Sequence, residues 1–383
     1  MKKSHRGLSF DMWDDGAGSK LIGVHLVFPD EKYQKPEFNL LCMCPLEDET
    51  NSTGDNQIVT MEKSLQDVGL SFNDIHFLVS DNTSVNPSIS RKVNVPLIGC
   101  RSHILAIAVK TEFLGPFESL VQKVNSLCVK LRSCKFRGYL RQEKCELTPF
   151  VVNGVRWSSV YTCLERYTEI RDFIVRTHQD LIDLVLTARE DAEVDGLLVH
   201  HQKFQSVTKH LQKSHVALSE AHALFDDLHA FYPELHHLSP AHAIVPNKPF
   251  ESAIMKVIAG SERDLSAVET RLMERFKTNN EGSDNEEPEG RHDYAESVLD
   301  RERKRRRISE AQKSEYIPLN WIPSTNNENE RVFSKNKHVF SDFRRAMHSN
   351  TLEALMFLKT NRALWDLKTV HYIIVKHPQD QEV

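Results

Sequence analysis

Two aspartates lie where a carboxylate needs a specific partner. Asp11 sits in the largely apolar segment Leu8–Trp13, and a buried carboxylate is costly unless a cation or hydrogen bonds compensate it. Asp81 directly follows the apolar segment His76–Ser80. In open α/β sheets, binding sites form at the carboxyl ends of central strands. The alternative for Asp81 is a helix cap, because residues 81–84 read Asp-Asn-Thr-Ser, all of them good capping residues.

The elements that would position these aspartates form an α/β unit over residues 7–113. In a strand, Ser9, Asp11 and Trp13 share one face and the apolar residues between them share the other. The first three strands are close together, as in an antiparallel meander. The expected order is strands at 8–13, 21–28 and 38–43, a helix at 56–70, a strand at 75–79, a helix at 84–93 and a strand at 95–98. This is the order of the ribonuclease-H-like fold, although other α/β folds share it.

The remainder of the chain changes character twice. Residues 101–275 show helical apolar spacing without strands. Their many histidines are interpreted as ordinary helix residues, because adjacent residues on a helix point about 100° apart and do not readily chelate one ion. An acidic, polar linker at 278–312 ends in the basic cluster Arg301–Arg307, either a nuclear localisation signal or a charge-balanced loop. Helices at 326–340 and 352–364 and a short strand or tail at 371–375 follow.

Composition narrows the class of protein. The 383 residues carry a formal net charge of -5, so any binding to DNA must come from local basic patches. We expect no membrane span and no secretory signal. Seven cysteines without a CxxC pair indicate reduced thiols in the nucleus or cytoplasm and no zinc finger. Cys42-Met43-Cys44 lies in an apolar run and is interpreted as strand packing rather than a metal site.

Several short blocks, in order, resemble the catalytic core of hAT-superfamily DNA transposases. Taken together they span residues 10–365, nearly the whole chain. The matching blocks are Phe10-Asp11-Met12-Trp13, Val79-Ser80-Asp81-Asn82 with Asn86, Val95-Pro96-Leu97-Ile98-Gly99-Cys100-Arg101-Ser102-His103, Val155-Arg156-Trp157-Ser158-Ser159, Asn329-Glu330-Arg331-Val332-Phe333-Ser334, and the C-terminal segment Leu352–Lys359 with Asn361–Trp365.

The resemblance implies a catalytic mechanism. Asp11, Asp81 and Glu330 would form an acidic triad that binds two Mg²⁺ or Mn²⁺ ions about 3.5–4 Å apart and supports phosphodiester cleavage and strand transfer at transposon ends. Glu328 is the rival third carboxylate, and the alternative for Glu330 is a solvated charge on a helix face. No small-molecule cofactor is expected.

The resemblance also implies roles in binding DNA. Arg156 would contact phosphate and Trp157 would stack on a displaced base. Cys100 and His103 would lie beside the active site and help to handle DNA. The alternatives are core packing for Trp157, and a buried thiol and a helix-start histidine for the other pair.

The same resemblance implies self-association and a domain plan. The predicted dimerisation residues are Phe333, Leu352, Leu355, Phe357, Leu358 and Trp365. The expected fold is a ribonuclease-H-like mixed sheet interrupted by a long all-helical insertion. Its parts are residues 1–113 of the core, an insertion at 114–277, the linker at 278–312, and the C-terminal core with the dimerisation region at 313–383.

Two hypotheses follow from the residues that match the family and those that do not. Family members normally begin with a zinc-finger DNA-binding domain, whereas this sequence starts close to the first-aspartate strand. The acidic turn at 14–18 and the acidic half of the linker also disfavour DNA. The chain is therefore either a metal-dependent transposase or nuclease of the DDE type, or an inactive or domesticated remnant that binds DNA or protein partners and dimerises.

Overall fold

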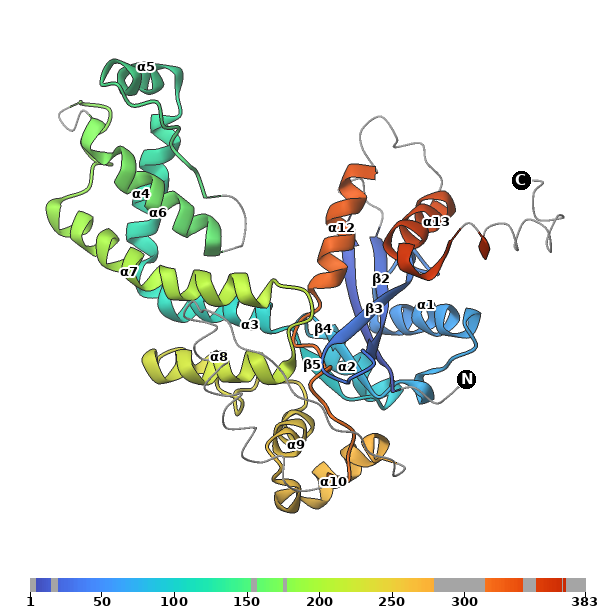
Figure 1. Cartoon of the computed structure of the whole chain (residues 1–383). Coiled ribbons are helices and arrows are strands. Elements are labelled where there is room, and N and C mark those ends of the chain that lie inside the picture. Colours follow the sequence, from blue (N-terminus) through green and yellow to red (C-terminus); the bar gives the residue numbers. More distant parts are fainter. Residues whose placement is uncertain are drawn as a thin grey trace.

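The computed structural model describes residues 5–14, 20–152, 157–174, 178–278, 314–339, 349–366 and 368–369. Figure 1 shows a sheet-centred part, formed by both ends of the chain, and a helical part that extends away from it. Residues 279–312 of the linker, which include the cluster Arg301–Arg307, and the segment expected at 371–375 lie outside the described residues.

In the described part of the chain, five strands form one mixed sheet in the order β3-β2-β1-β4-β5. They are β1 (Gly7–Asp14), β2 (Lys20–Pro29), β3 (Pro36–Pro45), β4 (Phe77–Ser80) and β5 (Leu97–Gly99). The first three are antiparallel, whereas β4 pairs in parallel with both β1 and β5. A register shift between Val24 and His25 interrupts the pairing of β2 with β3. The predicted order of strands and helices in this region is confirmed.

Helices cover both faces of the sheet. Alternation along β1 sends Leu8 and Phe10 into an apolar cluster under α1 (Gly54–Asp67) and α2 (Val85–Val93). The opposite face receives α12 (Asn327–Val339) and α13 (Ser349–Thr360), the two C-terminal helices. The short segments between or after these elements are η1 (Phe72–Asp74) and η9 (Arg362–Leu364). Sequence-distant helices therefore cover the face that carries Ser9 and Asp11.

The middle of the chain is helical, as its apolar spacing predicts. A continuous apolar core joins α3 through α8, while α9 and α10 pack with residues 316–322 against the sheet. The helices are α3 (Arg101–Ala108), α4 (Glu118–Leu131), α5 (Cys134–Gln142), α6 (Trp157–Ile170), α7 (Ala188–Leu211), α8 (Leu218–Phe231), α9 (Lys248–Ile258) and α10 (Ala267–Met273). Short helical segments are η2 (Val109–Phe113), η3 (Gly115–Phe117), η4 (Arg171–Phe173), η5 (His236–Leu238), η6 (Glu262–Asp264) and η7 (Glu274–Phe276).

No described helix combines the length and apolar character needed to span a bilayer.

Candidate functional site

The two predicted aspartates lie side by side at one end of the sheet. In the parallel pairing of β1 with β4, Leu8 is opposite Leu78 and Ser9 is opposite Val79. Continuing that register places Asp11 next to Asp81, just beyond the end of β4. The hydroxyl of Ser80 donates to the carbonyl of Phe10 at 2.9 Å and holds the two chains together at this point.

Local hydrogen bonds fix the side chain of Asp81. Its Oδ1 accepts from the hydroxyl of Thr83 at 2.9 Å and from Nδ2 of Asn86 at 2.5 Å. Asn86 is buried and also donates to the hydroxyl of Ser80 at 2.9 Å. Asp81 therefore accepts hydrogen bonds from residues at and before the start of α2, while the N-cap position of α2 is occupied by Ser84.

A buried polar contact brings the start of α12 onto the same face of the sheet. Nδ2 of Asn329 donates to the hydroxyl of Ser9 at 3.0 Å, and Nδ1 of His25 donates to Oδ1 of Asn329 at 2.7 Å. Burial lowers the pKa of His25 to about 4, so the imidazole is neutral at ordinary pH. Asn329 thereby ties α12 to β1 and β2, immediately before Glu330.

One turn further along α12, Phe333 packs beside Asp11. Its ring stacks on Trp13, with centroids 5.9 Å apart and an interplanar angle of 15°. Gly23 is the cross-strand partner of Asp11, and a Cβ at Gly23 would stand 2.9 Å from the Phe333 ring. The missing side chain at position 23 therefore allows α12 to approach the strand that carries Asp11.

The pKa of Asp11 is affected by both of the other predicted acidic residues, Asp81 and Glu330. Burial, together with the negative charges of Asp81 and Glu330, raises the pKa of Asp11 from 3.8 to about 7, while a hydrogen bond from the backbone N–H of Met12 opposes the rise. That bond is 2.9 Å long. Like charges that cannot separate disfavour ionisation of a neighbouring carboxyl. The structure therefore brings Asp11, Asp81 and Glu330 to one end of the sheet.

Glu330 has a histidine neighbour from the other side of the site. Nε2 of His103, on α3, lies 3.7 Å from Oε1 of Glu330, and both side chains are about one-third exposed. Cys100, one turn earlier, is fully buried, and burial raises its pKa to about 12. Its thiol also lies within the electrostatic influence of Glu330. His103 and Cys100 thus both lie near Glu330. The His103 side chain is accessible to solvent, whereas Cys100 is buried.

Glu328, the rival carboxylate, has a different partner. It forms an ion pair with Arg331 on the same helix, whose guanidinium also donates to the carbonyl of Gln212. The charges that raise the pKa of Asp11 include Glu330 and not Glu328. This distribution favours Glu330 as the third member of the acidic group.

Trp157 lies in the apolar core of the helical part. It is 3% exposed and stacks on His201, with ring centroids 5.5 Å apart. This is the core-packing alternative for Trp157, and stacking on a displaced base stays a prediction that requires this core to open. Arg156 lies outside the described residues.

The predicted dimerisation residues divide into two groups. Phe333 and Leu352 are buried against the sheet within one chain, and a part for them in dimer contacts stays a prediction. The apolar side chains of α13 that point away from the sheet, and Trp365, remain at the surface to different degrees. Leu355, Phe357 and Leu358 are 43%, 39% and 45% exposed, and Trp365 is half-buried beside Arg362.

Sequence reasoning gave no site role to three residues that position the acidic group. They are Asn329, Asn86 and Gly23, which respectively tie α12 to the sheet, hold Asp81 and admit α12 beside Asp11. The signal available was the polar Ser9 on the same strand face as Asp11, which requires a polar partner when buried. Which helix would supply that partner could not be read from local sequence.

Comparison with known families gives one match. Residues 319–362 match the family model described as the hAT family C-terminal dimerisation region. No curated protein matches the chain. The matched segment includes α12, with Asn329 and Glu330, and α13, with its exposed apolar side chains.

Proposed function

We propose that this hAT-family transposase-like protein has a ribonuclease-H-like core that binds DNA and cleaves phosphodiesters with Mg²⁺ or Mn²⁺ held by Asp11, Asp81 and Glu330. The match to the hAT dimerisation region supports the transposase-like origin and self-association. The observation that carries the catalytic proposal is the position of Asp11 beside Asp81 at the end of β4, on the face of the sheet that receives α12 with Glu330.

The strand order supports the ribonuclease-H-like part of the proposal. An antiparallel β3-β2-β1 meander is extended by the parallel strands β4 and β5, and the helical region separates β5 from α12. The expected fold has this order, with a first aspartate on β1, a second after β4 and a glutamate on a helix that returns from the far end of the chain.

The donor set suits a hard divalent cation. Mg²⁺ and Mn²⁺ prefer carboxylate oxygens, and a cation would offset the repulsion of Asp11 by Asp81 and Glu330. Among the described residues, the acidic group is not one of the sets whose ligand atoms lie close enough together to hold a single ion, so the proposal divides its carboxylates between two ions. Bound ions would polarise the scissile phosphate and activate the attacking oxygen.

The residues around the acidic group have different roles in this proposal. Asn86 holds the Asp81 carboxylate, and Asn329 holds the first turn of α12, so both are positioning residues. His103 lies beside Glu330 at the surface and is suited to contact a phosphate or to move a proton. Trp157 is proposed to contact DNA only if the start of α6 rearranges, and Arg156 is proposed to contact a phosphate.

A second function rests on a different observation. The exposed apolar side chains of α13 lie within the segment that matches the dimerisation region. A transposase-derived protein without nuclease activity could retain this surface as an interaction module. Nuclear localisation through Arg301–Arg307 remains part of either proposal.

A nicking assay decides between the two functions. Supercoiled plasmid is incubated with the full chain and Mg²⁺ or Mn²⁺, with Asp11→Asn and Glu330→Gln as test variants and Glu328→Gln as the matched control. Loss of an ion that supplies several kcal/mol of transition-state stabilisation slows cleavage about a hundredfold or more. We expect that loss in both test variants and near-normal nicking in the control. Metal-independent nicking, or equal rates in all four proteins, would overturn the catalytic proposal. No nicking by a chain that still self-associates would favour the interaction module.

A further inference from the structure

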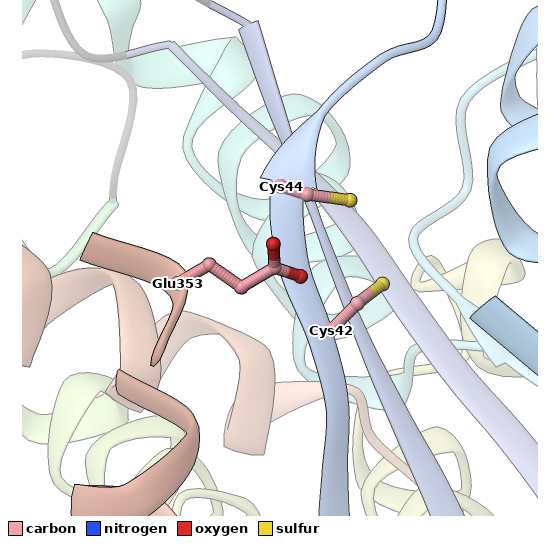
Figure 2. A group of neighbouring side chains, drawn as sticks. All are labelled: Cys42, Cys44 and Glu353. Carbon is pink, nitrogen blue, oxygen red and sulfur yellow. The ribbon is translucent and has the colours of Figure 1, made fainter. Parts of the chain in front are cut away.

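A second cluster of ligands lies at the opposite edge of the sheet. Among the described residues, Cys42, Cys44 and Glu353 form the group of three possible metal ligands whose donor atoms all lie within 4.8 Å of one another. Figure 2 shows both thiols projecting from β3 and the Glu353 side chain reaching that strand from α13. The sequence pattern alone suggested strand packing for the two cysteines.

The strand geometry explains why the two thiols are neighbours. Residues two apart on a strand point to the same face, so Cys42 and Cys44 share the face that packs toward α1, while Met43 faces α13. Cys42 is buried and Cys44 is partly exposed. A divalent ion could therefore reach the pair from solvent along the side of Cys44.

Glu353 reaches the thiols because β3 is the edge strand of the described sheet. Its carboxylate accepts a hydrogen bond from the backbone N–H of Met43, one of the groups that an edge strand leaves unpaired. The carboxylate therefore bends around the edge of the strand toward the thiols on the other face.

The backbone of α13 is held in place on both sides of Glu353. Leu352 and Met356 are buried against Leu40 and Met43. Further along, the side-chain amide of Asn361 donates to the carbonyl of Leu40 at 2.8 Å and accepts from its N–H at 2.9 Å. The carboxylate is thus presented to β3 by a docked helix, which reduces the cost of ordering a ligand.

A carboxylate lies beside the two thiols. The ligand atoms of Glu353, Cys42 and Cys44 all lie within 4.8 Å of one another. Lys63 forms an ion pair with Glu47 at 2.8 Å, and its positive charge also acts on Glu353. Coordination to a metal ion deprotonates a thiol outright.

We propose that Cys42, Cys44 and Glu353 form a binding site for a thiophilic divalent cation such as Zn²⁺, which clips α13 to the edge strand β3. Two thiolates and one carboxylate are an accepted zinc donor set, with a fourth position left for water. Each thiol releases its proton to solvent when the ion binds. The site is separate from the acidic group at β1 and β4, and two of its three ligands are thiolates, which Mg²⁺ disfavours.

The test is a Co²⁺ titration of the reduced full-length chain, followed by displacement with Zn²⁺. Cobalt bound to thiolates gives a near-ultraviolet charge-transfer absorption, so the signal reports sulfur ligation directly. We expect saturation at one equivalent in the wild-type chain and loss of the band in Cys44→Ser. Removal of even an outer partner weakens metal binding about 10–100-fold, so Glu353→Gln should weaken it by at least about tenfold.

Two controls make the result decisive. Cys134 is an exposed thiol on α5, so Cys134→Ser should leave the band and the stoichiometry unchanged. Asp11→Asn should also leave the thiolate band unchanged, because the acidic group contributes no sulfur ligand. A band that persists in Cys44→Ser, a Glu353→Gln chain that binds like wild type, or no thiolate band at all would overturn the proposal. If Cys44→Ser did not fold, Glu353→Gln alone would decide the outcome.

Discussion

At the residue scale, the electrostatic state of Asp11 connects the sequence pattern with the proposed chemistry. Burial and two like charges raise the pKa of this carboxyl, which lies on an apolar strand, from 3.8 to about 7. The negative charges of Asp81 and Glu330, which disfavour a free carboxylate at Asp11, would stabilise a bound divalent cation. The residue is therefore poorly suited to a purely structural role and well suited to a metal-binding role.

This electrostatic state predicts a pH-dependent stability. With metal removed, the folded chain keeps a proton on Asp11 up to a pKa of about 7, whereas the unfolded chain releases it near 3.8. The folded state binds more protons in that window, so this contribution to the free energy of unfolding is lost as pH rises from about 4 to 7. Asp11→Asn should abolish the loss. In EDTA, its advantage over wild type should grow by about 2–4 kcal/mol between pH 4.5 and pH 8.

Urea unfolding at the two pH values measures that difference. Asp14→Asn, at an exposed position of the same strand, serves as the matched control. Equal pH profiles for wild type and Asp11→Asn would show that the Asp11 carboxyl titrates normally.

At the element scale, the site depends on the docking of α12. Asn329 bonds to Ser9 and His25 while Phe333 fills the space over Gly23. The contacts of α12 therefore lie on both sides of Asp11 along β1, at Ser9 and at Trp13. The helix thus delivers Glu330 only when its buried face fits the sheet.

Gly23→Ala tests this fit. The added methyl would stand 2.9 Å from the Phe333 ring, and overpacking of this kind typically costs about 1–3 kcal/mol. We expect a loss of that size in the free energy of unfolding. Gly196→Ala on α7 is the control, because nothing lies within 4 Å of its added Cβ and alanine is favoured over glycine within a helix by about 0.5–1 kcal/mol. Equal stability of Gly23→Ala and wild type would argue that α12 is not packed on β2.

The elements of this region were largely predictable, whereas their long-range contacts were not. Alternation in Leu8–Trp13 predicts β1 and places Asp11 on the face opposite the α1 core, as observed. Periodicity does not report that Asn329 pairs with Ser9, because 320 residues separate them. The division of the dimerisation residues was missed for a related reason. Phe333 and Leu352 are as apolar as Leu355, and only the docking of both helices decides which are buried.

At the scale of the whole molecule, a buried charged contact joins the helical part to the sheet-centred part. The guanidinium of Arg101 pairs with Glu251 and lies 3.1 Å from Nε2 of His222. These residues come from α3, α9 and α8. Arg101 also donates its backbone N–H to the carbonyl of Ser324, just before α12. The start of the helical region and the return of the chain to the site are therefore fixed at one place.

The exposed face of α13 predicts how copies of the chain associate. Leu355 and Leu358 are exposed apolar residues within the matched dimerisation region, so the double substitution Leu355→Glu with Leu358→Glu should lower self-association at least tenfold while leaving the fold intact. Val199 is 70% exposed on α7, and Val199→Glu is the matched control. Sedimentation velocity at micromolar concentration measures both. Unchanged association of the double variant would place the interface elsewhere.

The central claim is that Asp11, Asp81 and Glu330 together bind a hard divalent cation. Electron paramagnetic resonance of free Mn²⁺ measures this binding without requiring DNA or activity, and Mn²⁺ favours carboxylate oxygens over thiols. The wild-type chain and Glu328→Gln should deplete free Mn²⁺ with equal affinity, whereas Asp11→Asn and Glu330→Gln should weaken binding about tenfold or more. Equal Mn²⁺ binding by all four proteins, or none by the wild-type chain, would contradict the account.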